Sequence, residues 1–291
     1  MQCPICDAPT PPAPAFLIHR YDEGDIPVMV CGVCEHSFAL EIPSASNAIR
    51  ELYDSYYHEE KVSPPSPRQS ARALRRLIER SYGAEARVID IGCNTGSNLL
   101  EFGDTRWELH GVEPAAPAAR MAREHTRATI HEGLLEDLDL PEAHFDYIIF
   151  NQVIEHIREP IAALQSIVRL LAPGGTLMLG TVDRQSRVAR QMGKAWPMYY
   201  STGHYHFFCD QSVTRMVEAC GLAITRRRWG GAPMPRSWVP HRSEVDELVK
   251  YRFLPVKVAR VLNSQAWAFM SMPWTRIPIC DHIFVWARHS T

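Results

Sequence analysis

Residues 87–98 read RVIDIGCNTGSN, an apolar run that ends at an acidic residue and continues through a glycine-bearing turn into the start of a helix. The run has the length and β-branched content of a buried parallel strand. Gly92 and Gly96 let the backbone approach a ligand closely, and the free N–H groups of the following helix suit a nucleotide-like ligand. The alternative is a turn that serves only chain reversal.

Strands and helices alternate around this turn. Buried strands are predicted at residues 87–91, 109–112, 147–150 and 176–180, with later β-rich stretches at 222–229 and 283–287. Helices are predicted at residues 69–82, 97–102, 115–125, 160–171 and 211–219. The breaker Pro173-Gly174-Gly175 is expected to separate the helix at 160–171 from the next strand. This βαβ series predicts an α/β fold with a Rossmann-like, doubly wound sheet.

Composition divides the chain into three segments. Residues 1–42 hold too few large apolar residues for a core of their own, and residues 43–68 have the Pro- and Ser-rich composition of a linker. Residues 69–291 are predicted to form the main domain, with a helical insertion at about 240–275. The insertion is expected to pack as core or lid, and the alternatives are contact with a partner chain or with a membrane.

The overall charge excludes some partners. The chain has 291 residues, a formal net charge of -2 and a pI near 6.7, so nothing in bulk attracts it to nucleic acid or anionic lipid. No secretory signal or membrane-spanning apolar stretch is recognisable, which predicts a cytoplasmic protein. In that reducing compartment, the 8 cysteines are expected to be metal ligands or buried small side chains.

Two C-x-x-C pairs, Cys3 with Cys6 and Cys31 with Cys34, flank a stretch long enough for a β-hairpin. Each pair offers two thiolates from one tight turn, which is the ligand set of tetrahedral Zn²⁺, and Gly32 is expected to ease the second turn. Four cysteine ligands leave no open position for water, so the predicted zinc is structural. The alternatives are buried cysteines and a redox pair.

A second feature supports a nucleotide-like cofactor. Glu113 ends the next predicted strand, at about the separation from the glycine turn where an acid meets ribose hydroxyls. Asn94 stands where the dinucleotide fingerprint G-x-G-x-x-G has its second glycine. This departure argues against NAD or FAD.

Together these residues resemble the class I S-adenosylmethionine-dependent methyltransferases. Residues 90–96 are similar to the family's acidic-x-G-x-G-x-G loop, and Glu113 matches its ribose-binding acid. Residues 132–138 and 145–156 resemble the adenine-side loop and fourth strand, and residues 170–175 the turn before strand five. The resemblance implies that S-adenosylmethionine is bound by Asp90, Gly92, Cys93, Asn94, Gly96, Asn98, Glu113, Pro114, Leu135, Glu136 and Asn151.

The order of cysteine module, Tyr-rich stretch at 53–57 and methyltransferase domain resembles a bacterial group with an N-terminal zinc ribbon, associated with sugar, polysaccharide and natural-product pathways. This implies a small-molecule acceptor such as a nucleotide-linked sugar. Related sugar C-methyltransferases carry a Glu-His pair where this chain has Tyr205-His206. The expectation is therefore O-methylation, with N-methylation open.

Three histidines are candidates for the base that takes the acceptor's proton. His204 and His206 follow the fifth strand and alternate onto one side of an extended segment, with Phe207 and Phe208 beside them to exclude water. The alternative is a hydrogen-bonded structural pair. His156 is the third candidate, and its alternative role is to orient the cofactor loop.

Arg226, Arg227 and Arg228 with Trp229, and later Arg236 and Trp238, form a basic-aromatic cluster that suits a phosphate or nucleotide, although such runs are commonly just solvated. Two other functions stay open. An RNA methyltransferase would use the zinc ribbon for docking but needs a broad basic surface. A non-catalytic scaffold would use it to recruit a partner.

Overall fold

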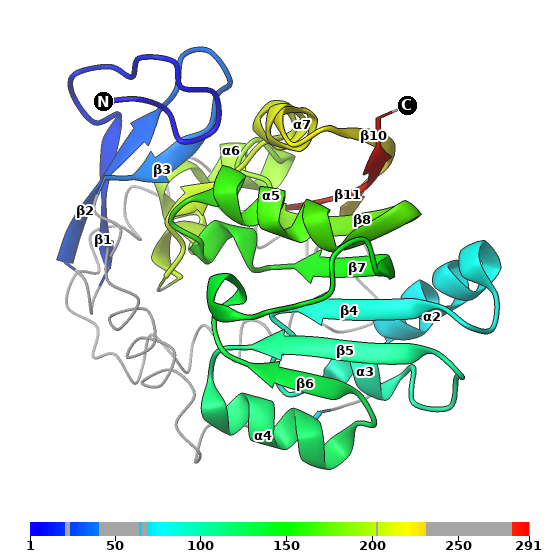
Figure 1. Cartoon of the computed structure of the whole chain (residues 1–291). Coiled ribbons are helices and arrows are strands. Elements are labelled where there is room, and N and C mark those ends of the chain that lie inside the picture. Colours follow the sequence, from blue (N-terminus) through cyan, green and yellow to red (C-terminus); the bar gives the residue numbers. More distant parts are fainter. Residues whose placement is uncertain (21–23, 41–63, 66–68, 202, 231–280, 291) are drawn as a thin grey trace. The chain divides into compact units, whose positions relative to one another are not determined.

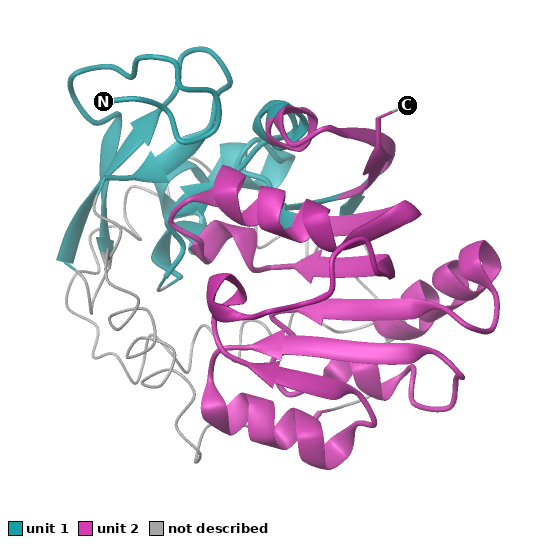
Figure 2. Ribbon diagram, viewed as in Figure 1, with its two compact units in different colours: residues 1–42, 181–215, 227–284 teal, residues 43–180, 216–226, 285–291 magenta. Residues whose placement is uncertain are grey.

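The computed structural model describes residues 1–20, 24–40, 64–65, 69–201, 203–230 and 281–290. The predicted insertion at 240–275, and the predicted linker apart from residues 64 and 65, lie outside these ranges. The chain forms two compact units, each built from separate stretches of sequence (Figure 2). Unit 1 contains residues 1–42, 181–215 and 227–284, and unit 2 contains residues 43–180, 216–226 and 285–291.

A seven-stranded sheet in the order β10-β11-β8-β7-β4-β5-β6 is the centre of the fold (Figure 1). Its strands are β4 (Arg87–Ile91), β5 (Glu108–Glu113), β6 (Thr129–Glu132), β7 (Phe145–Asn151), β8 (Leu171–Val182), β10 (Leu222–Gly230) and β11 (His282–His289). Strands β4 to β8 pair in parallel, with β4 between β5 and β7. The strand order reverses at β4, so the glycine turn that follows this strand lies where open α/β sheets bind ligands.

Helices follow the strands as the sequence predicts. They are α2 (Gln69–Tyr82), α3 (Ser97–Leu100), α4 (Ala116–His125), α5 (Pro160–Leu170), α6 (Arg187–Met192) and α7 (Asp210–Ala219). Short 3-10 turns lie at Leu135–Asp137, Ile154–His156, Gly193–Ala195 and Pro197–Tyr200. The parallel strands bury their apolar residues, and Ile89, Ile148 and Phe150 are fully buried. Among the described helices, none is both long and apolar enough to cross a membrane.

The sequence predicts that Pro173-Gly174-Gly175 separates a helix from the next strand, but in the structure these residues lie inside a strand. Strand β8 already begins at Leu171, which pairs with Phe145, and the register shifts before Thr176 pairs with Tyr147. Gly174 has φ 76 within this irregular part. The breaker residues therefore form a bulge inside the strand, which is the other position where proline and glycine are tolerated in a sheet.

Unit 1 contains a four-stranded antiparallel sheet in the order β1-β2-β3-β9. Strands β1 (Phe16–Arg20) and β2 (Gly24–Val30) form the hairpin predicted between the cysteine pairs. Strand β3 (Ser37–Ala39) then pairs with β9 (His206–Phe207). The cysteine segment thus shares a sheet with residues far along the chain, whereas composition alone suggested contiguous segments.

The core of unit 1 is shared in the same way. Ile18 and Val28 of the hairpin pack in one buried cluster with Trp196, Tyr199 and Phe207. Edge-to-face ring contacts join Tyr199 to both Trp196 and Phe207. Residues 1–40 therefore obtain from residues 182–207 the apolar surface that they lack themselves.

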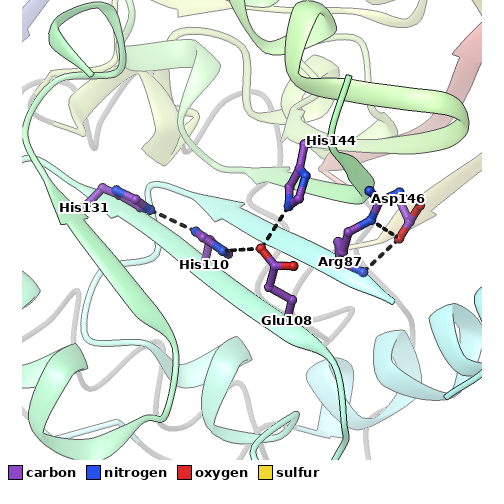
Figure 3. Close-up of polar contacts among 6 residues, drawn as sticks. All are labelled: Arg87, Glu108, His110, His131, His144 and Asp146. Atoms are coloured by element: carbon purple, nitrogen blue, oxygen red, sulfur yellow. Dashed lines mark hydrogen bonds and ion pairs between the residues drawn. The ribbon is translucent and has the colours of Figure 1, made fainter. Parts of the chain in front are cut away.

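At the amino ends of the parallel strands in unit 2, polar side chains form two separate groups of contacts (Figure 3). Oε1 of Glu108 lies 2.9 Å from Nε2 of both His110 and His144, and Nδ1 of His110 lies 2.9 Å from Nε2 of His131. Arg87 donates two side-chain hydrogen bonds to Asp146, joining β4 to β7. The hydrogen bonds from His144 and His110 lower the pKa of Glu108 against the effect of burial. Both groups lie at the opposite ends of the strands from the glycine turn.

Candidate functional site

The loop after β4 has an alternating backbone conformation that depends on its sequence. Gly92, Asn94 and Gly96 have φ of 74, 51 and 85, all in the left-handed region. Asparagine tolerates this region better than most side chains, and Oδ1 of Asn94 accepts a hydrogen bond of 2.6 Å from the backbone N–H of Thr95. Asn94 therefore takes the position of the family's middle glycine without breaking the loop.

Gly92 and Gly96 are required by packing as well as by φ. A Cβ on Gly92 would lie 2.4 Å from Cγ2 of Val153, and a Cβ on Gly96 would lie 2.8 Å from Cγ2 of Thr126. Both distances are too short for any side chain. The loop is thus closely packed against Val153 and Thr126 within unit 2. Sequence reasoning did not identify Val153 as a residue that restricts the loop.

Two glycines with nearly the same φ give a direct test of this packing. Gly83 has φ 72 and nothing within 4 Å of an added Cβ, so the only cost of G83A is the backbone strain of a positive φ. We expect G83A to lower the free energy of unfolding by about 1 kcal/mol, and G92A by about 3 kcal/mol because overpacking is added. Urea denaturation measures both. Equal losses in the two variants would show that Val153 does not restrict the loop.

Glu113, at the end of β5, is buried with 4% of its surface exposed. Its Oε2 accepts a 2.9 Å hydrogen bond from the backbone N–H of Asn94, and its Oε1 accepts one of 2.9 Å from that of Ala115. Burial raises the pKa of Glu113 to about 7, against the effect of these two N–H groups. One carboxylate therefore holds the glycine loop and the start of helix α4 together.

The other predicted cofactor residues lie in the same unit. Nδ2 of Asn98 donates a 3.1 Å hydrogen bond to Asp90, which is buried at the end of β4. Burial and the negative charges of Asp90 and Glu113 raise the pKa of Cys93, so its thiol stays protonated. Pro114 directly follows Glu113, and Leu135 and Glu136 lie in the turn Leu135–Asp137 after β6. The N–H of Gly133 donates to the carbonyl of Glu113, which ties that turn to the site.

Two polar atoms at the carboxyl end of β7 are buried with no hydrogen-bond partner among the described residues. They are Oδ1 of Asn151 and Nε2 of Gln152. Gln152 also has φ 58, an unusual conformation for this residue type. Buried polar groups are normally paired, so a polar ligand is the partner that this position suits. Together with Glu113 and the glycine loop, these atoms fit a nucleoside cofactor, and sequence reasoning missed Gln152.

The four cysteines of unit 1 come together as the sequence predicts. Their sulfur atoms lie within 4.8 Å of one another, and Cys3 Sγ–Cys34 Sγ and Cys6 Sγ–Cys31 Sγ are both 3.6 Å. The hydrogen bond with Cys34 lowers the pKa of Cys3 to about 5. Four converging sulfur atoms with one acidic thiol are a donor set that fits a tetrahedral zinc ion.

The two cysteine turns are built alike. Backbone N–H groups of Ile5 and Val33 point to Sγ of Cys3 and Cys31 at 3.5 and 3.4 Å. The residue after each pair, Asp7 or Glu35, has φ of 55 or 57 and donates its N–H to the carbonyl of the first cysteine. The expectation that Gly32 eases the second turn is wrong, because its φ is not positive and the left-handed residue is Glu35.

Of the three candidate histidines, His204 and His206 belong to unit 1 and His156 belongs to unit 2. His206 is fully buried in β9, and its Nδ1 lies 3.0 Å from Nε2 of His36, a residue that sequence reasoning did not select. His204 is 6% exposed and donates its backbone N–H to Ser201. His156 lies in the turn Ile154–His156 of unit 2. Burial, together with the charges of His206 and Arg184, lowers the pKa of His36 well below its usual value.

The predicted basic cluster is engaged within the protein. Arg226 lies over the ring of Trp286, 4.9 Å from its centroid. Arg227 forms an ion pair with Asp210 and a hydrogen bond to Thr214. These contacts occupy two of the three consecutive arginines, whereas Arg236 and Trp238 lie outside the described residues.

Comparison with known proteins identifies the family. A model of the methyltransferase domain family matches residues 65–226, more than half of the chain. The ubiquinone biosynthesis O-methyltransferase of Cereibacter sphaeroides is 28% identical over 176 residues, which cover 57% of this chain and 71% of that protein. The chain therefore belongs to the methyltransferase domain family and is a class I S-adenosylmethionine-dependent methyltransferase.

Solved structures share the fold. The [4+2]-cyclase SpnF has a TM-score of 0.56 at 18% identity, with 85% of this chain and 98% of that one covered. The 1,6-didemethyltoxoflavin-N1-methyltransferase of Burkholderia thailandensis, solved with S-adenosylhomocysteine, has a TM-score of 0.53 at 14% identity, with 88% and 96% covered. A cyclase among these structures means that fold alone does not define the reaction.

Proposed function

We propose that this protein transfers a methyl group from S-adenosylmethionine to a hydroxyl of a small-molecule acceptor, such as a sugar, a polysaccharide precursor or a natural product. The similarity to an O-methyltransferase over 71% of that relative's length carries this proposal. The near-neutral charge of the chain, -2, supports a small acceptor over a nucleic acid. The structural neighbour from Burkholderia thailandensis was likewise solved with a small molecule, 1,6-didemethyltoxoflavin.

The cofactor site is proposed to comprise the loop from Asp90 to Asn98, the acid Glu113 with Pro114, the turn with Leu135 and Glu136, and Asn151. Bound S-adenosylmethionine supplies an electrophilic methyl group on a sulfonium. The chain's own contribution is to hold this group in line with the acceptor oxygen, since alignment provides most of the rate in such a displacement. The buried, paired carboxylate of Glu113 suits the ribose hydroxyls.

The acceptor class is tested with methyl-labelled S-adenosylmethionine. The zinc-loaded protein is incubated with panels of nucleotide-linked sugars, phenolic compounds and amines, and labelled products are identified by mass spectrometry. A label on oxygen of a small acceptor supports the proposal. A label found only on nitrogen or only on added RNA would refute it.

A histidine is proposed to take the proton that the acceptor hydroxyl loses, and His204 is the first candidate, with His156 as the second. We expect H204A to lower kcat roughly tenfold, because a base adds to what alignment already provides. The affinity for S-adenosylmethionine should stay unchanged, since His204 is not among the cofactor residues. The exposed His125 offers a control, H125A. Unchanged kcat in H204A, with a loss in H156A, would transfer the role to His156.

The four cysteines are proposed to hold one structural Zn²⁺. Their sulfur cluster and the N–H groups directed at Cys3 and Cys31 support this assignment. The metal would contribute folding energy to residues 1–40, whose apolar side chains otherwise pack mainly against residues 182–207.

A further inference from the structure

The second cysteine turn is built into the segment that carries the candidate histidines. Backbone carbonyls of three consecutive residues accept hydrogen bonds from it: Val33 from Nε2 of Gln211 at 3.0 Å, Cys34 from Sγ of Cys209 at 3.7 Å, and Glu35 from the guanidinium of Arg184 at 2.9 and 3.1 Å. Arg184 also donates its backbone N–H to the carbonyl of Phe208. The second cysteine turn, here called the metal turn, and residues 204–211 are thus joined by hydrogen bonds within unit 1.

His36 directly follows the second cysteine turn and contacts both this turn and strand β9. Its carbonyl accepts the N–H of Cys31 at 2.8 Å, and its ring stacks on His206 with centroids 5.2 Å apart and planes at 21°. Phe208 covers it with ring centroids at 4.7 Å. Both imidazoles are fully buried. These contacts restrict the orientation of the His36 ring.

The hydrogen bond between the two rings determines where their protons lie. Nε2 of His36 and Nδ1 of His206 are 3.0 Å apart, so one must donate. If His206 donated, the proton of His36 would lie on its Nδ1, which is buried with no partner among the described residues. Buried N–H groups without an acceptor are rarer than buried acceptors without a donor. His36 is therefore the donor, and His206 carries its proton on Nε2.

We propose that His36 is a positioning residue for methyl transfer: it fixes His206 as the Nε2–H tautomer and thereby holds the segment from His204 to Phe208 in place. In this arrangement Nδ1 of His206 is occupied by its hydrogen bond and Nε2 carries a proton, so His206 has no lone pair to act as a base. The base is then His204 rather than His206. This rests on the proposed function, and it gives the metal turn a role in catalysis through residues of this chain.

The tautomer can be measured without any acceptor. Long-range ¹H–¹⁵N correlation spectra of the zinc-loaded protein, with His206 assigned by comparison with H206Q, report which ring nitrogen carries the proton. We expect the proton on Nε2 of His206 and on Nε2 of His36. A proton on Nδ1 of His206 would overturn the proposal, whether or not methyl transfer has been observed.

Kinetics test the positioning role. H36F keeps the ring stack but cannot donate, whereas H36Q retains an amide donor near the position of Nε2. We expect H36F to lower kcat roughly tenfold with the KM for S-adenosylmethionine and the zinc content unchanged, and H36Q to restore most of kcat. A zinc-loaded H36F with the kcat of the wild type would overturn the proposal. Absence of methyl transfer in the wild type itself would instead count against the proposed function, and the tautomer would still decide the role of His36.

Discussion

Replacing Glu113 by glutamine is expected to weaken the binding of S-adenosylmethionine roughly a hundredfold. The carboxylate accepts N–H groups of Asn94 and Ala115 on its two oxygens, and glutamine has only one oxygen to offer. One backbone N–H would then face an amide NH₂, and the charge that suits the ribose hydroxyls would be lost. Titration calorimetry measures the change, with the exposed Glu124 as the matched control, E124Q.

The same carboxyl gives the binding a pH dependence. Burial raises the pKa of Glu113 to about 7, so the free protein takes up a proton on this group as the pH falls through that value. Because the ribose hydroxyls favour the ionised form, the affinity for S-adenosylmethionine is highest above about pH 7. Below that pH it falls by a factor that approaches about tenfold per pH unit. E113Q should lack this dependence. A wild-type affinity that is equal at about pH 8 and pH 6 would show that Glu113 does not bind the cofactor.

Replacing Cys31 by serine is expected to release the proposed zinc and unfold the amino-terminal segment of unit 1. Structural zinc sites contribute on the order of 10 kcal/mol of folding energy, far more than any single contact that residues 1–40 make. The proposed cofactor residues belong to unit 2, so the affinity for S-adenosylmethionine should change little. Elemental analysis measures the zinc, and limited proteolysis detects cleavage within residues 1–40.

The control for this substitution is C220S, since Cys220 lies outside the sulfur cluster and its Sγ contacts only the carbonyl of Ile161 among the described hydrogen bonds. This variant should keep one zinc per chain and resist the protease. If C31S also keeps its zinc and its resistance, the four cysteines do not form a structural metal site.

Local pattern predicted the parallel strands and most helices well. The run at 87–91 became β4 with the same bounds, and residues 69–82 became helix α2, because a buried strand and an amphipathic helix each leave a clear period in the sequence. The cysteine cluster was also predictable, since ligand spacing within each pair is set by one tight turn. The α/β fold and its Rossmann-like sheet are confirmed by the strand order.

Features that depend on contacts between distant residues were not predictable. The pairing of His36 with His206 joins residues 170 positions apart through the two-residue strand β9, which is too short to leave a pattern. Val153 shapes the glycine loop only through its position in space. The bulge at Pro173-Gly174-Gly175 contains the residue types that also end helices, so the sequence could not distinguish a helix end from a bulge in a strand. The unusual φ of Gln152 has no sequence signal, because glutamine rarely adopts it.

The most direct test of the cofactor assignment is calorimetric titration of the zinc-loaded protein with S-adenosylmethionine and S-adenosylhomocysteine. We expect one molecule of either compound to bind per chain, with a dissociation constant on the order of micromolar, equivalent to about 8 kcal/mol. Absence of heat with both compounds, from a protein that retains its zinc, would contradict the assignment of this chain as a working methyltransferase.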